Sequence, residues 1–482
     1  MGGNYEKKLF EHLQEALEKV DRLTAEVASM KVEHKKEMEI LRAENQRLSK
    51  ENQALKGEVQ KLKDIIHKNS GNSSKPPSSD GFTKIQNSRE KSGKRPGGQF
   101  GHKGTPPRLF SNPTRIEDIK AEKCGCGGKI AYTGKYTAKQ AVDIEITTTI
   151  VEYREHEGIC QCCHRQVKNH APVNDRITYG SNLKSFSAML SLEGMVSINR
   201  IQQMLRELTD GQLNLSEGTI AKWIKDLSKC VAPAIDKIKE NLLASALLHK
   251  DETGIRINKA LHWLHVLGNK THTLYLAHKK RGNEADKEMG ILPVYSGILV
   301  HDHLRGLYDF TCDHAECNAH ILRYLKASIE SKNRKWAQNM IELLLHAKTV
   351  VAHCDGKPPP SYQIQKIHQQ YNEILERAFL EFLRSESPDY NGEDMKLLRR
   401  LQKYKTEHLR FLSEPSVPFD NNQAERDLRM IKAKTKISGC FRANDGGQVF
   451  ASLKSYTATL RKNNLNIFSG IKAAFELKPF LC

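Results

Sequence analysis

A heptad repeat constrains the first 67 residues more tightly than any other pattern in the chain. Residues 5–67 contain no proline, and their leucines recur every seven residues at Leu41, Leu48, Leu55 and Leu62. Asn45 and Asn52 take positions in the other row of the seam, where asparagine favours a parallel, in-register dimer. Residues 1–67 are therefore predicted to form a coiled-coil helix that makes a homodimer or a higher oligomer. A single amphipathic helix lying on the protein's own body is the alternative.

The charge of the whole chain indicates a polyanionic partner. Its 482 residues include 76 Lys and Arg against 57 Asp and Glu, a net charge of +19. Such an excess attracts nucleic acid, and solubility alone is the other explanation. The sequence has neither a run of about 18 apolar residues nor an apolar signal segment, so no membrane contact is expected. Eleven scattered cysteines favour reduced thiols and a cytoplasmic location, associated with the nucleoid if the partner is DNA.

Residues 68–115 differ abruptly from the helix before them. They are rich in Ser, Gly and Pro, and residues 81–110 carry seven Lys or Arg against one Glu. A segment of this composition cannot bury a core, so it is predicted to be a basic linker that follows a phosphate backbone, or a plain spacer. The next segment, residues 116–175, has cysteines at both ends of an alternating run. That run, residues 143–156, is predicted to be a strand.

Four cysteines of residues 116–175 have spacings typical of a zinc site: Cys124, Cys126, Cys160 and Cys163. The second pair has the C-x-x-C spacing, the first pair is the tighter C-x-C, and Cys162 is a competing ligand. One Zn²⁺ held tetrahedrally by four thiolates would make this segment a small zinc-finger-like module. Buried or free thiols are the alternative.

Two helices predicted within residues 176–240 are similar to a helix-turn-helix. The first covers INRIQQMLREL, and the second follows a Gly-containing turn and Ser216, which can cap it. Lys222 and Lys225 share a face of the second helix and are candidates for DNA contacts. A helix pair that only packs within the protein is the alternative.

The apolar segments after residue 244 indicate the fold class. Three short strands are followed by a fourth that ends in an acid, and then by helices. This order predicts a ribonuclease H-like core, a mixed sheet flanked by helices, within a multidomain α/β protein. The core is expected over residues 241–326 and 413–482, with a helical insertion at 327–412.

Three acids are placed so that they can converge at one edge of this sheet. Asp251 lies on the first strand, Asp302 ends the fourth, and Glu425 lies on a late helix. Three carboxylates can hold two Mg²⁺ or Mn²⁺ ions for phosphoryl transfer, although each acid alone is more often a cap or turn residue. The helix of Glu425 also carries basic side chains predicted to contact DNA, a solvated basic face being the alternative. They are Arg426, Arg429, Lys432 and Lys434.

Motifs along nearly the whole chain resemble the insertion-sequence-66 family of DDE transposases. They are KNSGNSSKPPSSD with GGQFGHKG near the N-terminus, HKDETGIRI, FDNNQAERDLRMIKAKTKISGCFRANDGG, and SLKSYTATLRKNNLNIF. The resemblance implies a DNA transposase that binds double-stranded element ends and cleaves and transfers strands. It also implies a catalytic triad of Asp251, Asp302 and Glu425, a zinc-finger-like region, and accessory proteins of the same element as further candidate partners.

The middle block, HDHLRGLYDF, departs from the family pattern. His303 replaces the small residue expected after Asp302, and Asp309 and Asp313 are alternative second acids. Cys317 and His320 match a Cys-x-x-His signature that we interpret as structural. Three other functions stay open: a non-catalytic DNA-binding regulator, a nuclease without strand transfer, and a scaffold whose coiled coil is the whole function.

Overall fold

The chain forms two compact units, which are described separately. One contains Met1–Ile85 with Leu322–Ile341, and the other contains Gln86–Ile321 with Glu342–Cys482. The computed structural model describes residues 3–67, 101, 108–332, 334–384 and 392–481. Most of the predicted linker, and the N-terminal motifs of the resemblance apart from Gly101, therefore lie outside the described residues.

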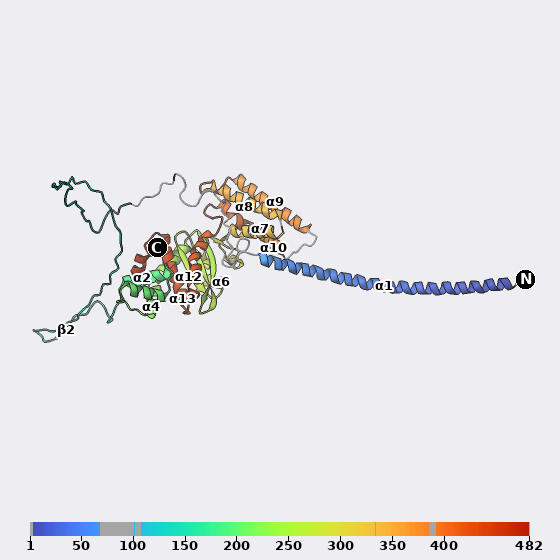
Figure 1. Cartoon of the computed structure of the whole chain (residues 1–482), viewed down its shortest axis with the longest axis horizontal. Helices are drawn as coiled ribbons and strands as arrows, with labels where there is room; N and C mark the ends of the chain where they lie inside the picture. Colours follow the sequence, from blue (N-terminus) through green and yellow to red (C-terminus); the bar gives the residue numbers. More distant parts are fainter. Residues whose placement is uncertain (1–2, 68–100, 102–107, 333, 385–391, 482) are drawn as a thin grey trace. The chain divides into compact units, whose positions relative to one another are not determined.

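Residues 3–67 form one long helix, as predicted. Helix α1 covers Gly3–His67 without interruption (Figure 1). Leucines of the heptad seam are exposed along it: Leu41, Leu48, Leu55 and Leu62. Pairing of this seam with a second copy stays a prediction.

The cysteine-rich segment contains one short hairpin. Strand β1 (Glu157–Ile159) pairs antiparallel with β2 (Gln166–Lys168). The strand predicted over residues 143–156 is wrong, because that stretch has no regular secondary structure. Its alternating apolar residues are exposed, Ile144 to 83% and Ile150 to 80%. A strand needs a neighbour for its backbone groups, and no neighbouring strand lies against this stretch in the described part of the chain.

Four helices lie directly before the sheet in the sequence: α2 (Ser181–Leu192), α3 (Ile198–Leu208), α4 (Glu217–Cys230) and α5 (Ala232–Leu243). Helices α3 and α4 confirm the two predicted helices. The Ser216 side chain caps α4 by accepting a hydrogen bond from the backbone N–H of Thr219 at 3.1 Å. Ile201, Ile220 and Trp223 belong to one buried cluster, so this pair has its own core.

A five-stranded mixed sheet follows, in the order β5-β4-β3-β6-β7. Its strands are β3 (Leu247–Ile257), β4 (Ala260–Gly268), β5 (Thr273–His278), β6 (Ile298–His301) and β7 (Asp313–Glu316). Strands β3, β4 and β5 are antiparallel neighbours, whereas β6 and β7 run parallel to β3. The first four confirm the predicted strands. Strand β7 was missed, because Ala315 is its only apolar residue and its pairing with β6 defines it.

Both faces of the sheet are covered by apolar side chains. On one face Ile255 and Val266 join a cluster with Leu428 of α12 (Asn422–Ser438) and Phe450 of α13 (Gly446–Lys462). Figure 1 shows α12 and α13 beside the strands. On the other face Leu267 packs with residues of α5 and α6 (Asn283–Met289). The alternation of Val266 and Leu267 is that of a strand buried on both sides.

The remaining elements are helical. Short 3-10 turns η2 (Leu292–Val294) and η3 (Arg305–Asp309) flank β6, and α14 (Ile467–Phe475) ends the chain. Between the sheet and α12 lie α7 (Asn318–Lys332), α8 (Lys335–Ala352), α9 (Ser361–Leu383), α10 (Glu393–Lys403) and α11 (Lys405–Ser413). The helices predicted for this region are confirmed, apart from the missed strand at its start.

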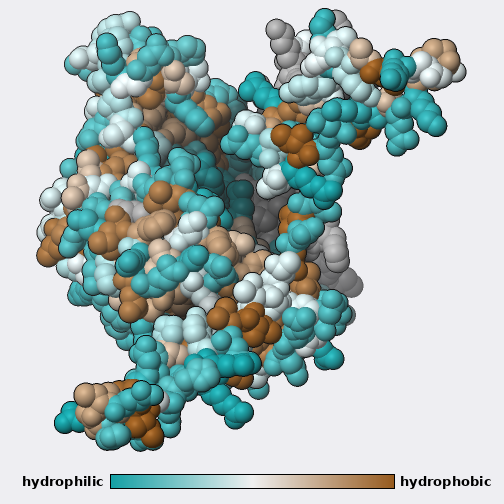
Figure 2. Space-filling model, turned by 90° about the vertical axis from the view of Figure 1, so that its left-hand side faces the viewer, coloured by the Kyte–Doolittle hydropathy of each residue, from teal (hydrophilic) through white to brown (hydrophobic). Residues whose placement is uncertain are grey.

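Among the described residues, none of the helices combines the length and the apolar character needed to cross a membrane. In the view of Figure 2, hydrophobic residues form separate patches among hydrophilic ones.

Candidate functional site

Asp251 and Asp302 occupy equivalent positions on adjacent parallel strands. The last register pair of β3 and β6 is His249 with Val300, and each acid lies two residues beyond its member of that pair. Adjacent strands are about 4.8 Å apart, and facing residues of parallel strands point to the same side. The two carboxyl groups are therefore neighbours at the carboxyl end of β6.

Burial and nearby negative charges make both acids hard to ionise. Burial, followed by the charges of Asp302 and Glu252, raises the pKa of Asp251 from 3.8 to about 7. Burial and the charge of Glu252 raise the pKa of Asp302 to about 6, although Arg281 and Lys250 oppose this change. Oδ1 of Asp302 is buried and has no hydrogen-bond partner among the described residues. A divalent cation would neutralise this pair and satisfy the unpaired oxygen.

Asn421, which immediately precedes α12, anchors that helix to β3. Its Oδ1 lies 2.9 Å from Nδ1 of His249, and its Nδ2 donates to the carbonyl of Lys250 at 2.8 Å. Its backbone N–H donates to Sγ of Cys317 at 3.2 Å. His249 and Asp251 alternate on β3 and share a face, so the start of α12 lies on the face that carries Asp251.

The directions of α12 and β3 favour a position of Glu425 level with Asp251. Helix α12 runs in the same direction as β3, because Phe441, just after the helix, forms a parallel bridge with the far end of the strand. The contact between His249 and Asn421 gives a common starting point. Asp251 lies two residues after His249 along β3, a distance of about 6.6 Å. Glu425 is four helical residues further along, about 6 Å. These positions favour convergence of the three predicted acids at one edge of the sheet, which stays a prediction.

The opposite face of β3 carries a buried charged cluster that the sequence analysis missed. Lys250 is fully buried, and its Nζ lies 3.3 Å from Asp286, 3.6 Å from Glu252 and 3.0 Å from Nδ1 of His265. Arg281 donates to Glu252 at 2.8 Å. Burial opposes ionisation of Glu252, but Lys250 and Arg281 outweigh it and lower the pKa of that carboxyl. The signal for this cluster was the charged triplet Lys-Asp-Glu inside an apolar strand.

The alternative second acids are engaged elsewhere. Asp309 is exposed and accepts a hydrogen bond from Asn283 at 2.5 Å. Asp313 pairs with Ile298, at the opposite end of β6 from Asp302, and forms an ion pair with Arg410 at 3.0 Å. Neither residue therefore has the register position that Asp302 has opposite Asp251.

Cys317 of the Cys-x-x-His signature is fully buried just before α7. Burial raises the pKa of its thiol to about 12, so Cys317 is neutral at physiological pH. Its sulfur accepts the hydrogen bond from Asn421 that helps to anchor α12. These contacts support the structural interpretation of this cysteine.

Three of the predicted basic contacts line one groove of about 820 Å³. Lys222 and Lys225 come from α4, and Lys434 comes from the C-terminal half of α12. Lys225 forms an ion pair with Asp445 at 2.6 Å, which raises the pKa of the lysine. The other three are exposed on α12 and outside the groove lining: Arg426, Arg429 and Lys432.

The predicted zinc ligands remain as two separate pairs. Sγ of Cys126 lies 3.3 Å from Sγ of Cys124, and Cys160 and Cys163 are hydrogen-bonded to each other. Hydrogen bonds from Gly128 and Cys124 lower the pKa of Cys126, which favours the thiolate form that binds metal. Across the described ranges, no group of three or more metal-ligating side chains contains a cysteine. A four-thiolate zinc site stays a prediction.

Comparisons with known proteins found similarity over several parts of the chain. A family profile described as "Transposase IS66 family" matches residues 176–449, and a profile of a family of unknown function matches residues 12–108. The chain is also similar to the uncharacterized protein y4jO of Sinorhizobium fredii, with 36% identity over 73 residues. That similarity covers 15% of this chain and 23% of the relative, so the chain matches less than a quarter of the relative's length.

Proposed function

The chain belongs to the IS66 transposase family, whose profile covers more than half of its 482 residues, and we propose that it cleaves and joins DNA at Asp251, Asp302 and Glu425. The observation that carries the proposal is the proximity of Asp251 and Asp302: each lies two residues beyond the last register pair of β3 and β6, and the charge of Asp302 acts on Asp251. Two partly buried acids beside each other are unfavourable without a cation, so this arrangement needs a functional reason.

The sheet supports a ribonuclease H-like core. Three antiparallel strands are followed by two strands parallel to the first, and α12 covers the face that carries Asp251. In this fold, Asp251 of β3, Asp302 after β6 and Glu425 of α12 would meet at one edge of the sheet. Asp251 and Glu425 are 174 positions apart in the sequence.

The donor set suits Mg²⁺ or Mn²⁺. Carboxylate oxygens are the hard ligands that these ions prefer, and the unpaired buried oxygen of Asp302 is available to one of them. When bound, two such ions would activate the attacking hydroxyl and stabilise the leaving oxygen of the phosphodiester. Asp251 and Asp302 would hold them from the sheet, and Glu425 from α12.

The basic residues of α12 and α4 supply the DNA-binding surface in this proposal. Lys434 is nine residues after Glu425, about 13 Å along the helix, which corresponds to about four base steps. Lys222 and Lys225 line the same groove as Lys434, so a duplex seated there would contact α4 as a helix-turn-helix does. Arg426, next to Glu425 and exposed, is the first candidate for a phosphate contact beside the metal ions.

Dimerisation through α1 and zinc binding by the cysteines are the remaining parts of the proposal. The exposed seam of α1 supports dimerisation through a coiled coil, which would hold two element ends together. The two cysteine pairs would come together around Zn²⁺ when the ion is present. Accessory proteins of the same element are further partners in this proposal, and the DNA substrate implies association with the nucleoid.

Cleavage of a DNA end that carries the element's terminal repeat tests the function. With Mg²⁺ or Mn²⁺, Asp251→Ala, Asp302→Ala and Glu425→Ala should each abolish cleavage and leave DNA binding intact. Asp313→Ala, an exposed acid of the same block, is the matched control and should cleave like the wild type. Equal cleavage by all four variants would refute the proposed site. Cleavage without joined products would identify a nuclease, and DNA binding without cleavage by the wild type would identify a regulator.

A further inference from the structure

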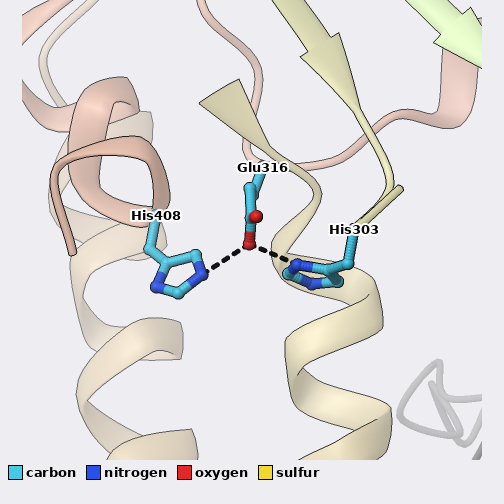
Figure 3. A group of neighbouring side chains, drawn as sticks. All are labelled: His303, Glu316 and His408. Atoms are coloured by element: carbon cyan, nitrogen blue, oxygen red, sulfur yellow. Dashed lines mark hydrogen bonds and ion pairs between the residues drawn. The ribbon is translucent and has the colours of Figure 1, made fainter. Parts of the chain in front are cut away.

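A second cluster of metal-ligating side chains lies beside Asp302. His303 follows that acid, Glu316 ends β7, and His408 lies on α11. Figure 3 shows both imidazole rings directed at one oxygen of the Glu316 carboxylate. His303 forms an ion pair with that oxygen, and Nε2 of His408 lies 2.7 Å from it. One ligand atom from each of the three residues lies within 4.8 Å of the others.

The cluster is buried and its outer atoms are held in place. Glu316 is 2% exposed and His408 is 0% exposed. The hydroxyl of Tyr308 donates to the other carboxylate oxygen of Glu316 at 2.5 Å. Tyr371 lies 3.1 Å from Nδ1 of His408 on the far side of that ring. Ligands of protein-bound metals are oriented by such outer hydrogen bonds.

The hydrogen bonds of Tyr371 show which nitrogen of His408 carries the proton. The tyrosine hydroxyl has one proton and lies 2.9 Å from the carbonyl of Leu401, which can only accept. Tyr371 therefore donates to Leu401, and Nδ1 of His408 must donate to Tyr371. The lone pair of a neutral His408 is then on Nε2, which faces the carboxylate of Glu316. Two acceptors 2.7 Å apart repel each other, so this tautomer is favourable only when both bind a shared cation.

We propose that His303, Glu316 and His408 bind one divalent transition-metal ion, with Zn²⁺ as the best match. Two imidazoles and a carboxylate are a known zinc ligand set, whereas Mg²⁺ prefers oxygen ligands alone. A neutral His408 with its lone pair on Nε2 is in the ligating state. The competing arrangement places a proton there, which makes a buried imidazolium–carboxylate pair.

The ion would connect three segments that are distant in the sequence. Glu316 is paired in register with His301, so His303 and Glu316 lie at the same ends of β6 and β7. Helix α11 already contacts this strand pair, since Arg410 donates to the carbonyl of His314 at 2.8 Å. The metal would attach α11 to the segment that carries Asp302. Its role is to position that segment, and the binding of zinc does not depend on whether the protein cleaves DNA.

Metal analysis of a suitable full-length background tests the site. The background removes competing ligands by replacing Cys124, Cys126, Cys160, Cys162 and Cys163 with serine and Asp251 with asparagine. After growth with Zn²⁺ and exhaustive dialysis, we expect one zinc per chain by elemental mass spectrometry. Co²⁺ in place of zinc should give visible d–d bands without a thiolate charge-transfer band. A zinc-free background protein that also fails to bind added Zn²⁺ or Co²⁺ would overturn the proposal in favour of the imidazolium pair.

Single substitutions in this background assign the ligands. Glu316→Gln and His408→Gln should lose the zinc, and His353→Gln, an exposed histidine outside the cluster, should keep it. Tyr308→Phe retains all three ligands and should weaken zinc binding about 10- to 100-fold. This variant and the background decide the matter even if a ligand variant fails to fold. Unchanged zinc content and affinity in every variant would place the ion elsewhere.

Discussion

Replacing Asp251 with asparagine should stabilise the metal-free protein, and more so at pH 8 than at pH 5. The carboxyl of Asp251 has its pKa raised from 3.8 to about 7 because it is buried and faces the charges of Asp302 and Glu252. A carboxyl whose pKa is higher in the folded state binds its proton more tightly there. The contribution of this carboxyl to the stability of the folded state is fully present below about pH 3.8 and is lost as the pH rises through about 7. Asparagine keeps the shape and never ionises.

The size of the effect follows from the shift. A change of about three pKa units corresponds to about 4 kcal/mol against the ionised form at pH 8. At pH 5 the same group costs about 1.7 kcal/mol, so the advantage of the variant grows by about 2.5 kcal/mol between the two conditions. For a core of 150–250 residues this corresponds to roughly 5–10 °C in Tm. The figure is an upper one, because the surrounding structure can relax around the charge.

Thermal unfolding with EDTA present, followed by tryptophan fluorescence at pH 5 and pH 8, measures this difference. Wild type, Asp251→Asn and the exposed control Asp313→Asn are compared at each pH. We expect the Tm of Asp251→Asn to exceed that of the wild type, with a larger gap at pH 8, while the control follows the wild type. A variant no more stable than the wild type at pH 8, or a gap independent of pH, would refute the reasoning about this carboxyl pair.

Four further predictions concern the metal ions, the anchor of α12, the DNA-binding surface and the dimer surface. At pH 8, added Mg²⁺ should raise the Tm of the wild type and leave that of Asp251→Asn nearly unchanged, by mass action on the folded state. Asn421→Ala should lower the free energy of unfolding by about 1–3 kcal/mol and reduce cleavage more than DNA binding, because it leaves buried partners unpaired. For Lys434→Ala, the slope of the logarithm of the DNA-binding constant against the logarithm of salt concentration should fall by about one. The double variant Leu48→Asp with Leu55→Asp should be a monomer by light scattering, with its sheet intact.

Local patterns along the sequence were sufficient for most of the elements. The heptads predicted the single helix α1, and the apolar spacing predicted α3, α4 and α12. Ser216 was identified as the cap of α4 because capping depends on neighbouring residues alone. The strands β3 to β6 were predicted for the same reason, since their apolar runs are bounded by turns.

Pairing between distant segments decided where strands form. Residues 143–156 alternate like a strand but have no partner for their backbone groups, whereas β7 has a single apolar residue and forms through its hydrogen bonds to β6. Strand propensity depends on such neighbours, which a local pattern does not contain.

The sequence by itself placed Asp251 within a predicted strand, Asp302 at the end of another and Glu425 near the start of a predicted helix. Only the tertiary structure showed that Asp251 and Asp302 are close enough for their charges to interact, and that Asn421 anchors α12 to β3. It alone brought together His303 from a loop, Glu316 from a strand end and His408 from a helix. His303 and His408 are 105 positions apart in the sequence. The reason is physical: helix and strand preferences act over a few residues, whereas a site is made by contacts whose partners are chosen when the chain packs.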